Sequence, residues 1–185
     1  LNDDDSAYLS RTPSSAGNRS TWTWSGWVKR GNLGLGLWRT IFAGTNASGN
    51  TEGLFFHTND SLLFMNGGGS YTTSALYRDC SSWYHFVAVS DNTQAAAGDR
   101  MKLYVNGVLV TAFSSSTDPS QSATSGFVND TRVHYHFRSD PMDGYLAEVH
   151  FIDGQALDHT SFGETGDYGE WKPIEVTGMT YGTNG

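Results

Sequence analysis

A two-residue segment, Asn106-Gly107, stands between two strand-like runs, RMKLYV at 100–105 and VLVTAF at 108–113. Asn-Gly pairs favour the type I′ turn, because both residues tolerate positive φ and the twist of that turn matches the flanking strands. A chain with this signal reverses direction within two residues. The segment therefore predicts an antiparallel β-hairpin and places this part of the chain in a sheet.

Alternating apolar and polar residues recur along the chain, whereas helical periodicity is nearly absent. The stretches that predict strands are 22–28, 40–43, 53–57, 61–66, 83–90, 100–113, 127–138 and 145–152. The Ser/Thr-rich segment 114–126 is predicted to be a structureless surface loop, and the tail 168–185 to be irregular. About eleven to thirteen short strands predict an all-β fold, a two-sheet antiparallel β-sandwich jelly roll.

Composition and charge limit the classes of partner. The 185 residues carry a net charge of −8, which disfavours nucleic acid, since phosphate binding needs clustered Lys and Arg. The sequence contains no long apolar run, so no membrane span is predicted. Cys80 is the single cysteine, so no internal disulfide is expected. The length predicts a single domain over 1–185, and the final YGTNG resembles a turn entering a missing strand, which predicts a truncated C-terminal end.

Three stretches, at 21–30, 83–110 and 144–157, carry the longest recognisable patterns in the chain. Their sequences are TWTWSGWVKR, then WYHFVAVSD with DRMKLYVNGVLV, and GYLAEVHFIDGQAL. In this order they resemble the laminin-G-like, concanavalin-A-like jelly-roll family, over nearly the whole chain. The resemblance implies a fold that usually binds sugars or protein surfaces and usually does no chemistry. It also implies that Trp27 and Val28 point into the core and that His85 is structural.

A narrower resemblance rests on AYLSRTPSSAGNRSTWTWSGWVKR, YRDCSSWYH and FIDGQALDHTSFGE. These stretches look like a laminin-G-like module of structural proteins in marine tailed phages. The resemblance implies an extracellular virion location, in a tail fibre or appendage, with host attachment through a surface glycan. The alternative is a purely structural or capsid-decoration module that contacts a neighbouring virion protein. A homo-oligomer within a fibre or particle is compatible with both.

A third hypothesis is a glycan-cleaving enzyme. Glycosidases of this fold carry paired carboxylates at alternating strand positions, so that acid and nucleophile face one cleft about 5–5.5 Å apart. Glu148 is followed on its strand face by His150 and Ile152, and Asp153 falls on the other face. Because the expected pair is missing, no catalytic residue is predicted and the chain is expected not to be an enzyme.

Sugar sites combine an aromatic platform with planar polar groups, since a pyranose ring has an apolar face and hydroxyl edges. The aromatics that the core pattern demands least are Trp38, Tyr71, Tyr77, Tyr135 and Trp171, with Arg78 the first polar candidate beside them. Further polar candidates are Arg39, Asn66, Asn129, Arg132 and Arg138. Taken singly, each aromatic is as readily explained by packing.

Calcium is the cofactor that the loops could hold, because it takes several oxygen ligands. Asp140 and Asp143 precede the Gly144 turn and form the favoured candidate site. The loop with Asp91, Asn92 and Asp99 is a second possibility, and solvated loop acids are the alternative to both. His134 and His136 alternate on one strand face, with His150 as a possible neighbour. They could ligate a transition metal, but a polar, exposed strand face explains them equally.

Overall fold

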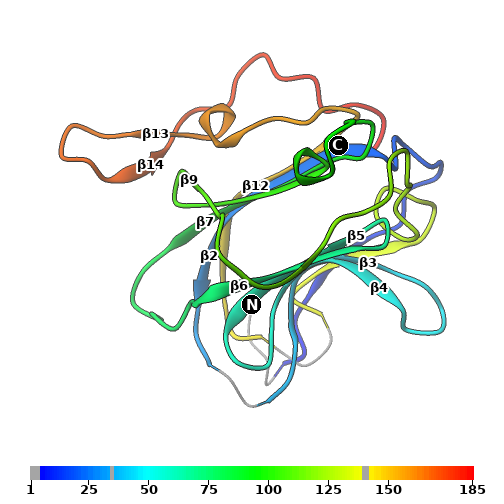
Figure 1. Ribbon diagram of the computed structural model, residues 1–185. Coiled ribbons are helices and arrows are strands. Elements are labelled where there is room, and N and C mark those ends of the chain that lie inside the picture. Colours follow the sequence, from blue (N-terminus) through cyan, green and yellow to red (C-terminus); the bar gives the residue numbers. More distant parts are fainter. Residues whose placement is uncertain (1–4, 34–35, 139–141) are drawn as a thin grey trace.

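A computed structural model describes residues 5–33, 36–138 and 142–185 of the chain. Over this part of the chain, strands form two large antiparallel sheets that pack face to face, with two short 3₁₀ turns, η1 (Ala97–Asp99) and η2 (His159–Ser161) (Figure 1). The predicted all-β fold, a two-sheet antiparallel β-sandwich of the concanavalin-A-like jelly-roll type, is confirmed.

The two sheets draw their strands from distant parts of the sequence. The seven-stranded sheet has the order β1 (Leu9–Arg11), β11 (Val133–His136), β3 (Arg39–Thr45), β4 (Thr51–Phe56), β5 (Ser61–Asn66), β6 (Gly69–Leu76) and β10 (Phe113–Thr117). The five-stranded sheet has the order β12 (Gly144–Asp153), β2 (Thr21–Arg30), β7 (Tyr84–Asp91), β8 (Met101–Val105) and β9 (Val108–Leu109). A separate hairpin joins β13 (Gly163–Thr165) to β14 (Trp171–Pro173). The short edge strand β1 pairs only with β11.

Turn residues act as the sequence predicts. Asn106 and Gly107 have φ of 48° and 78°, and Val105 pairs with Val108 across them. Gly67 and Gly68, with φ of 57° and 82°, turn β5 into β6. Positive φ at these positions is the conformation that Asn and Gly adopt at least cost, which explains the predicted hairpin at Asn106-Gly107 and a second one, at Gly67-Gly68, that was not predicted.

The main core lies between the sheets and is built on aromatic side chains. Trp22, Trp24 and Val28 of β2 are fully buried and point into it, as their alternation predicts. Trp27 does not: it lies on the outer face of the five-stranded sheet, where its ring stacks on His85 at 4.9 Å between centroids. The expectation from the family resemblance that Trp27 enters the core is therefore wrong, because neighbouring strand residues point to opposite faces.

The chain after β12 returns across the outer face of the five-stranded sheet. Val87, Val89, Ile152 and Phe162 form a second buried cluster beneath it. Partly buried side chains that pack against this cluster are Tyr104, Leu157, Val176, Met179 and Tyr181. The tail is thus only partly irregular, since it includes the β13–β14 hairpin.

The segment 114–126 also corrects a prediction. Its first part belongs to β10, which pairs with β6 in the register Ser116 to Tyr71 and Thr117 to Ser70. The Ser/Thr run is a strand because the edge of β6 offers it backbone hydrogen-bond partners. This is a tertiary effect, which the composition of the run does not indicate.

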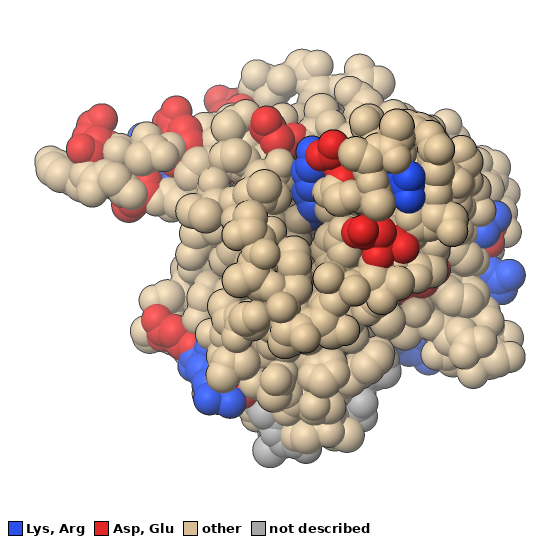
Figure 2. Space-filling view, in the orientation of Figure 1, with Lys and Arg blue, Asp and Glu red and all other residues tan. Residues whose placement is uncertain are grey.

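Charged side chains are sparse over much of the surface seen in Figure 2, and acidic ones gather on the projecting β13–β14 hairpin. Glu164, Asp167 and Glu170 are exposed there. Among the residues that the structure describes, no helix has the length and apolar character that crossing a membrane requires.

Candidate functional site

Two of the aromatic residues predicted to bind sugar are core residues. Tyr71 is 5% exposed and donates its hydroxyl to the Asp118 carboxylate, and burial raises the pKa of its phenol. Tyr77 is 7% exposed and packs edge-on against Tyr84 and Phe86. Both belong to the main core cluster, which corrects the expectation that the core does not need them.

The other predicted residues lie far apart on the fold. Trp38, on the outer side of the seven-stranded sheet, packs its half-exposed ring against Phe55 and His57. Arg78 forms a 3.0 Å ion pair with Asp60. Trp171 of β14 donates its indole N–H to His85 at 2.9 Å. Among the predicted aromatic residues, Tyr135 is the one that lies in a cleft suited to a sugar, and the predicted Arg132 and Arg138 line the same cleft.

This cleft, called the β11 cleft below, lies beside the outer face of β11 and has a volume of about 410 Å³. Its lining residues are Thr45, Asn46, Ala47, Arg132, Val133, Tyr135 and Arg138. Tyr135 pairs with Ala43 of β3 and Ser10 of β1, on the face of the sheet opposite to His134 and His136. Strand alternation therefore directs the Tyr135 ring away from the core.

Tyr135 and Arg138 line the cleft, and the Tyr8 ring lies beside them. The Tyr8 and Tyr135 rings meet edge to face at 5.7 Å, and the Arg138 guanidinium lies 4.0 Å above the Tyr135 ring and 5.8 Å from that of Tyr8. Tyr8 remains 48% exposed. The arrangement offers an apolar ring surface next to planar N–H donors, the combination that a sugar face and its hydroxyls require. No pattern in the sequence indicates Tyr8, because it precedes the three-residue strand β1 and belongs to no strand itself.

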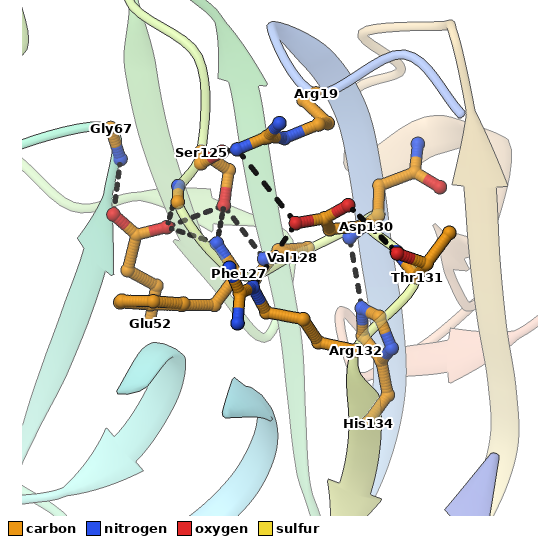
Figure 3. A network of polar contacts seen from close by, with 12 residues as sticks. Arg19, Glu52, Gly67, Ser125, Phe127, Val128, Asp130, Thr131, Arg132 and His134 are labelled. Carbon is orange, nitrogen blue, oxygen red and sulfur yellow. Dashed lines mark hydrogen bonds and ion pairs between the residues drawn. The ribbon is translucent and has the colours of Figure 1, made fainter. Parts of the chain in front are cut away.

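The loop that leads into β11 is held by one carboxylate (Figure 3). Glu52 of β4 accepts hydrogen bonds from the backbone N–H groups of Gly67 at 3.0 Å, Gly126 at 2.7 Å and Phe127 at 3.2 Å, and from the Ser125 hydroxyl. The Ser125 hydroxyl in turn accepts from Val128 N–H at 2.7 Å. Charge-assisted bonds of this kind fix a loop before any ligand binds.

Arg132 is positioned by a second carboxylate in the same view (Figure 3). Asp130 accepts from Arg132 Nε at 3.1 Å and from Thr131 N–H at 2.8 Å, and Arg19 lies 4.0 Å away. These contacts lower the pKa of Asp130 although burial acts in the opposite direction. The Arg132 guanidinium at the cleft is therefore oriented by the protein itself.

The predicted calcium site is only partly within the described residues. Asp140 lies outside them, and the Asp143 carbonyl accepts from Gly31 N–H at 2.8 Å. In the alternative loop, the Asp91 carboxylate accepts from Thr93 and Gln94, and Asp99 pairs with Lys102. Within the described ranges no group of three His, Cys, Asp or Glu side chains could hold a metal ion. Calcium at Asp140 and Asp143 stays a prediction.

The histidine pair of β11 faces inward. His134 and His136 lie on the core side of the strand, where the Phe42 ring stacks near both. His150 lies on the outer face of the other sheet and contacts the Tyr181 hydroxyl at 2.8 Å. The hypotheses of an exposed histidine face and of a neighbouring His150 are both wrong, because β11 directs Tyr135 outward instead.

Glu148 lies in a β-bulge of β12. Its φ is 47°, its side chain is 57% exposed, and its carboxylate is 3.8 Å from His150 Nε2. Asp153 is buried and accepts from Asn18 N–H at 2.7 Å and Asn129 Nδ2 at 2.6 Å. The two acids therefore occupy different environments on different faces, as predicted.

Comparison with known proteins adds a family and a set of similar folds. Residues 2–160 match the profile of the concanavalin A-like lectin/glucanases superfamily. Among curated proteins, none matches the chain. A SAP-like heptameric pentraxin from Limulus polyphemus is 14% identical with a TM-score of 0.50, over 81% of this chain and 70% of the pentraxin.

Two further solved structures are parts of longer chains. Trypanosoma rangeli sialidase is 16% identical with a TM-score of 0.54, over 77% of this chain and 22% of the sialidase. The binding domain of botulinum neurotoxin DC, in complex with SialylT, is 14% identical with a TM-score of 0.54, over 82% of this chain and 36% of the toxin chain. This chain thus spans well under two thirds of either protein, and at these identities the likeness shows the fold alone.

Proposed function

This chain belongs to the concanavalin A-like lectin/glucanases superfamily, and from that premise we propose that it is a carbohydrate-binding module whose ligand occupies the β11 cleft. The observation that carries the proposal is the exposed Tyr8 ring beside the Tyr135–Arg138 stack. A pyranose ring packs its apolar face on Tyr8, and its hydroxyls accept hydrogen bonds from Arg138 and Arg132. Asn46 at the rim supplies the Nδ2 donor, since its Oδ1 already accepts from Ser48 and Asn50 N–H.

A single shallow cleft binds weakly, so useful attachment comes from several copies. We extend the proposal to a virion surface, where a fibre or particle presents many copies to a host glycan. Support for this setting is the resemblance of the chain to phage structural modules. A calcium ion at Asp140 and Asp143, if bound, serves to order the loop before β12 rather than to contact sugar.

The test is a glycan array probed with the chain fused to an oligomerisation domain, followed by titration of the best ligand into monomer. Tyr8→Ala and Arg138→Gln are expected to weaken binding at least about tenfold, the loss of one stacking or charge-assisted contact. Tyr168→Ala is the matched control, because Tyr168 is 96% exposed on the distant β13–β14 hairpin. A blank array, or equal losses for Tyr8 and Tyr168, contradicts the proposal.

The module is proposed to be non-catalytic. The neighbour of Glu148 is the His150 imidazole rather than a second carboxylate, and Asp153 is engaged by the Asn129 amide. Hydrolysis needs an acid and a second carboxylate facing one substrate. Release of reducing ends from a bound polysaccharide, lost in Glu148→Gln, contradicts this part.

A purely structural or decoration role is the second candidate, and one observation favours it. Trp83 and Tyr145 are 38% and 62% exposed, and their rings lie 6.3 Å apart. Clustered exposed aromatics are typical of protein contacts. If Tyr145→Ser abolishes co-assembly with a neighbouring virion protein while the glycan array is blank, the structural role replaces the lectin role.

A further inference from the structure

A cavity of about 170 Å³ lies between the two sheets, on the inner side of β11. Its lining residues are Leu9, Ser10, Arg11, Pro13, Phe42, Asn129, His134, His136, Phe151 and Asn184. They come from β1, β3 and β11 of one sheet, from β12 of the other, and from the loops and tail beside them. The cavity is therefore on the opposite side of β11 from the cleft assigned to sugar.

The cavity walls are aromatic. The Phe42 ring lies 5.5 Å from Phe151 and 5.3 Å from His136, and it stacks on His134 at 6.0 Å and 21°. These rings pack directly on one another and form one continuous aromatic wall, against which a planar guest can make offset-stacked or edge contacts.

The Nε2 nitrogens of both wall imidazoles are already engaged, whereas His134 Nδ1 is buried without a hydrogen-bond partner. His136 Nε2 accepts from the Trp24 indole N–H at 3.1 Å, and His134 Nε2 accepts from Asn129 N–H at 2.9 Å. Burial lowers the pKa of both rings, to about 4 for His136, so both are neutral at neutral pH. The histidines therefore act as uncharged aromatic walls.

Arg11 places a positive charge at the opening of the cavity. Arg11 pairs in register with His134, and Leu9 with His136, so the two exposed side chains flank the opening from β1. Arg11 Nη1 donates to the Asn184 carbonyl at 2.9 Å. A guanidinium carries five N–H donors in a planar fork, so one such bond leaves donors that can bind a carboxylate.

A space of this size is not ordinary packing. Protein interiors leave few voids larger than a water molecule. An apolar cavity of about 150 Å³ in another protein is known to bind benzene. Here the cavity also opens beside the Arg11 guanidinium. A mere packing defect would not explain a cation at the opening.

From the aromatic walls, the volume and the position of Arg11, we propose that this cavity binds a single-ring aromatic carboxylate of the benzoate class. The ring lies against the wall formed by Phe42, Phe151 and the two histidines, and the carboxylate accepts hydrogen bonds from Arg11. This site is distinct from the β11 cleft and does not depend on sugar binding.

The experiment titrates benzoate, toluene and acetate separately into ¹⁵N-labelled protein and follows the amide and indole signals by NMR. Benzoate is expected to shift the Trp24 indole and the β1 and β11 amides saturably, with a dissociation constant on the order of 1 mM or below. Toluene is expected to bind at least about tenfold more weakly, and acetate to produce no saturable shift. Absence of saturable shifts with benzoate, or equal binding of acetate, overturns the proposal.

Substitutions at the cavity opening test where benzoate binds. Leu9→Trp is expected to fill the mouth and abolish benzoate binding, whereas Leu76→Trp, at a position that is also exposed, leaves it unchanged. Arg11→Gln is expected to weaken benzoate about tenfold without affecting toluene, and it remains informative if Leu9→Trp fails to fold. Tyr8→Ala, which tests the sugar cleft, is expected to leave benzoate affinity unchanged. Unchanged benzoate affinity in Arg11→Gln overturns the assignment of the carboxylate.

Discussion

The imidazole of His85 joins the five-stranded sheet to the hairpin that covers its outer face. Its Nδ1 accepts from the Trp171 indole N–H at 2.9 Å, so its Nε2 carries the proton and donates to the Ser25 hydroxyl, also at 2.9 Å. The ring stacks between Trp27 and Trp171. Burial, together with the nearby His150 and His159, lowers the pKa of His85 to about 4. Protonation of Nδ1 would remove the acceptor that holds Trp171.

The buried histidines predict acid-sensitive stability. His85 and His136 have pKa values of about 4 in the fold, against an ordinary value of 6.5. Between these values the unfolded chain binds more protons than the native one, so stability is full above about pH 6.5 and falls as the pH drops toward 4. Each ring contributes about 3 kcal/mol to this loss.

Urea unfolding followed by tryptophan fluorescence at pH 7.5, 5.5 and 4.5 measures the loss. His136→Gln, which removes one of the rings, is expected to reduce the loss by about 3 kcal/mol. A free energy of unfolding that stays constant over this range, or an equal loss in the variant, contradicts the prediction.

The two tryptophans on opposite faces of β2 are expected to contribute unequally to the free energy of unfolding. Trp24 is fully buried between the sheets, so Trp24→Ala is expected to lower the free energy of unfolding by about 3–5 kcal/mol. Trp27 lies on the outer face and is only partly buried, so Trp27→Ala is expected to cost about 1–2 kcal/mol. Chemical denaturation of both variants decides the order, and an equal or reversed cost means that Trp27 is a core residue after all.

At the scale of elements, Glu52 links β4 to the loop that carries the candidate site. Its two carboxylate oxygens accept from three backbone N–H groups and a hydroxyl that come from two separate segments. An amide in its place retains one acceptor oxygen, so some of these donors lose their partner. Glu52→Gln is therefore expected to destabilise the fold by about 1–3 kcal/mol and to loosen residues 125–128.

Hydrogen exchange of the 125–128 amides, with urea unfolding beside it, measures both effects. Glu164→Gln is the control, because the exposed ion pair of Glu164 with Lys172, at 3.2 Å, contributes at most about 1 kcal/mol. Unchanged protection of Gly126 and Phe127 in Glu52→Gln would show that other contacts hold the loop.

Elements whose conformation is set by their own residues could be predicted from the sequence. Elements whose conformation depends on contacts with distant segments could not. Asn106-Gly107 forms a turn through its own backbone preferences, so its hairpin was predicted. The Ser/Thr run in β10 becomes a strand only through its contact with β6, which lies far away in the sequence.

The candidate site follows the same rule. Tyr135 was predicted from its type and its strand, but its partner Tyr8 lies just before a three-residue strand and outside any periodic pattern. Tyr71 and Tyr77 were misplaced because alternation gives the face of a residue, not what covers that face.

At the scale of the whole molecule, Asp153 connects three regions that are distant in the sequence. Its Oδ1 accepts from Asn18 N–H at 2.7 Å and Asn129 Nδ2 at 2.6 Å, and its Oδ2 accepts from Asn184 N–H at 3.3 Å. Its own backbone N–H donates to the Tyr181 carbonyl at 2.9 Å. One buried carboxylate thereby holds the loop before β2, the loop before β11 and the final residues of the described chain against the end of β12.

This convergence predicts that Asp153→Ala is among the costlier polar substitutions. It leaves the Asn18 N–H and one N–H of the buried Asn129 amide without their acceptor, so the expected loss is about 2–4 kcal/mol. Asp153→Asn keeps one acceptor oxygen and is expected to lose less, whereas Asp167→Ala, on the exposed hairpin, changes stability by no more than about 0.5 kcal/mol. Urea unfolding of the three variants gives the order of their stability losses.

Limited proteolysis shows which segment is released in Asp153→Ala. Loss of the Asn184 anchor is expected to expose the C-terminal segment to cleavage before the sheets unfold. If Asp153→Ala lowers stability while the C-terminal segment stays protected, the anchor lies in the contacts of Asn184 with Ser15 and Asn129 instead.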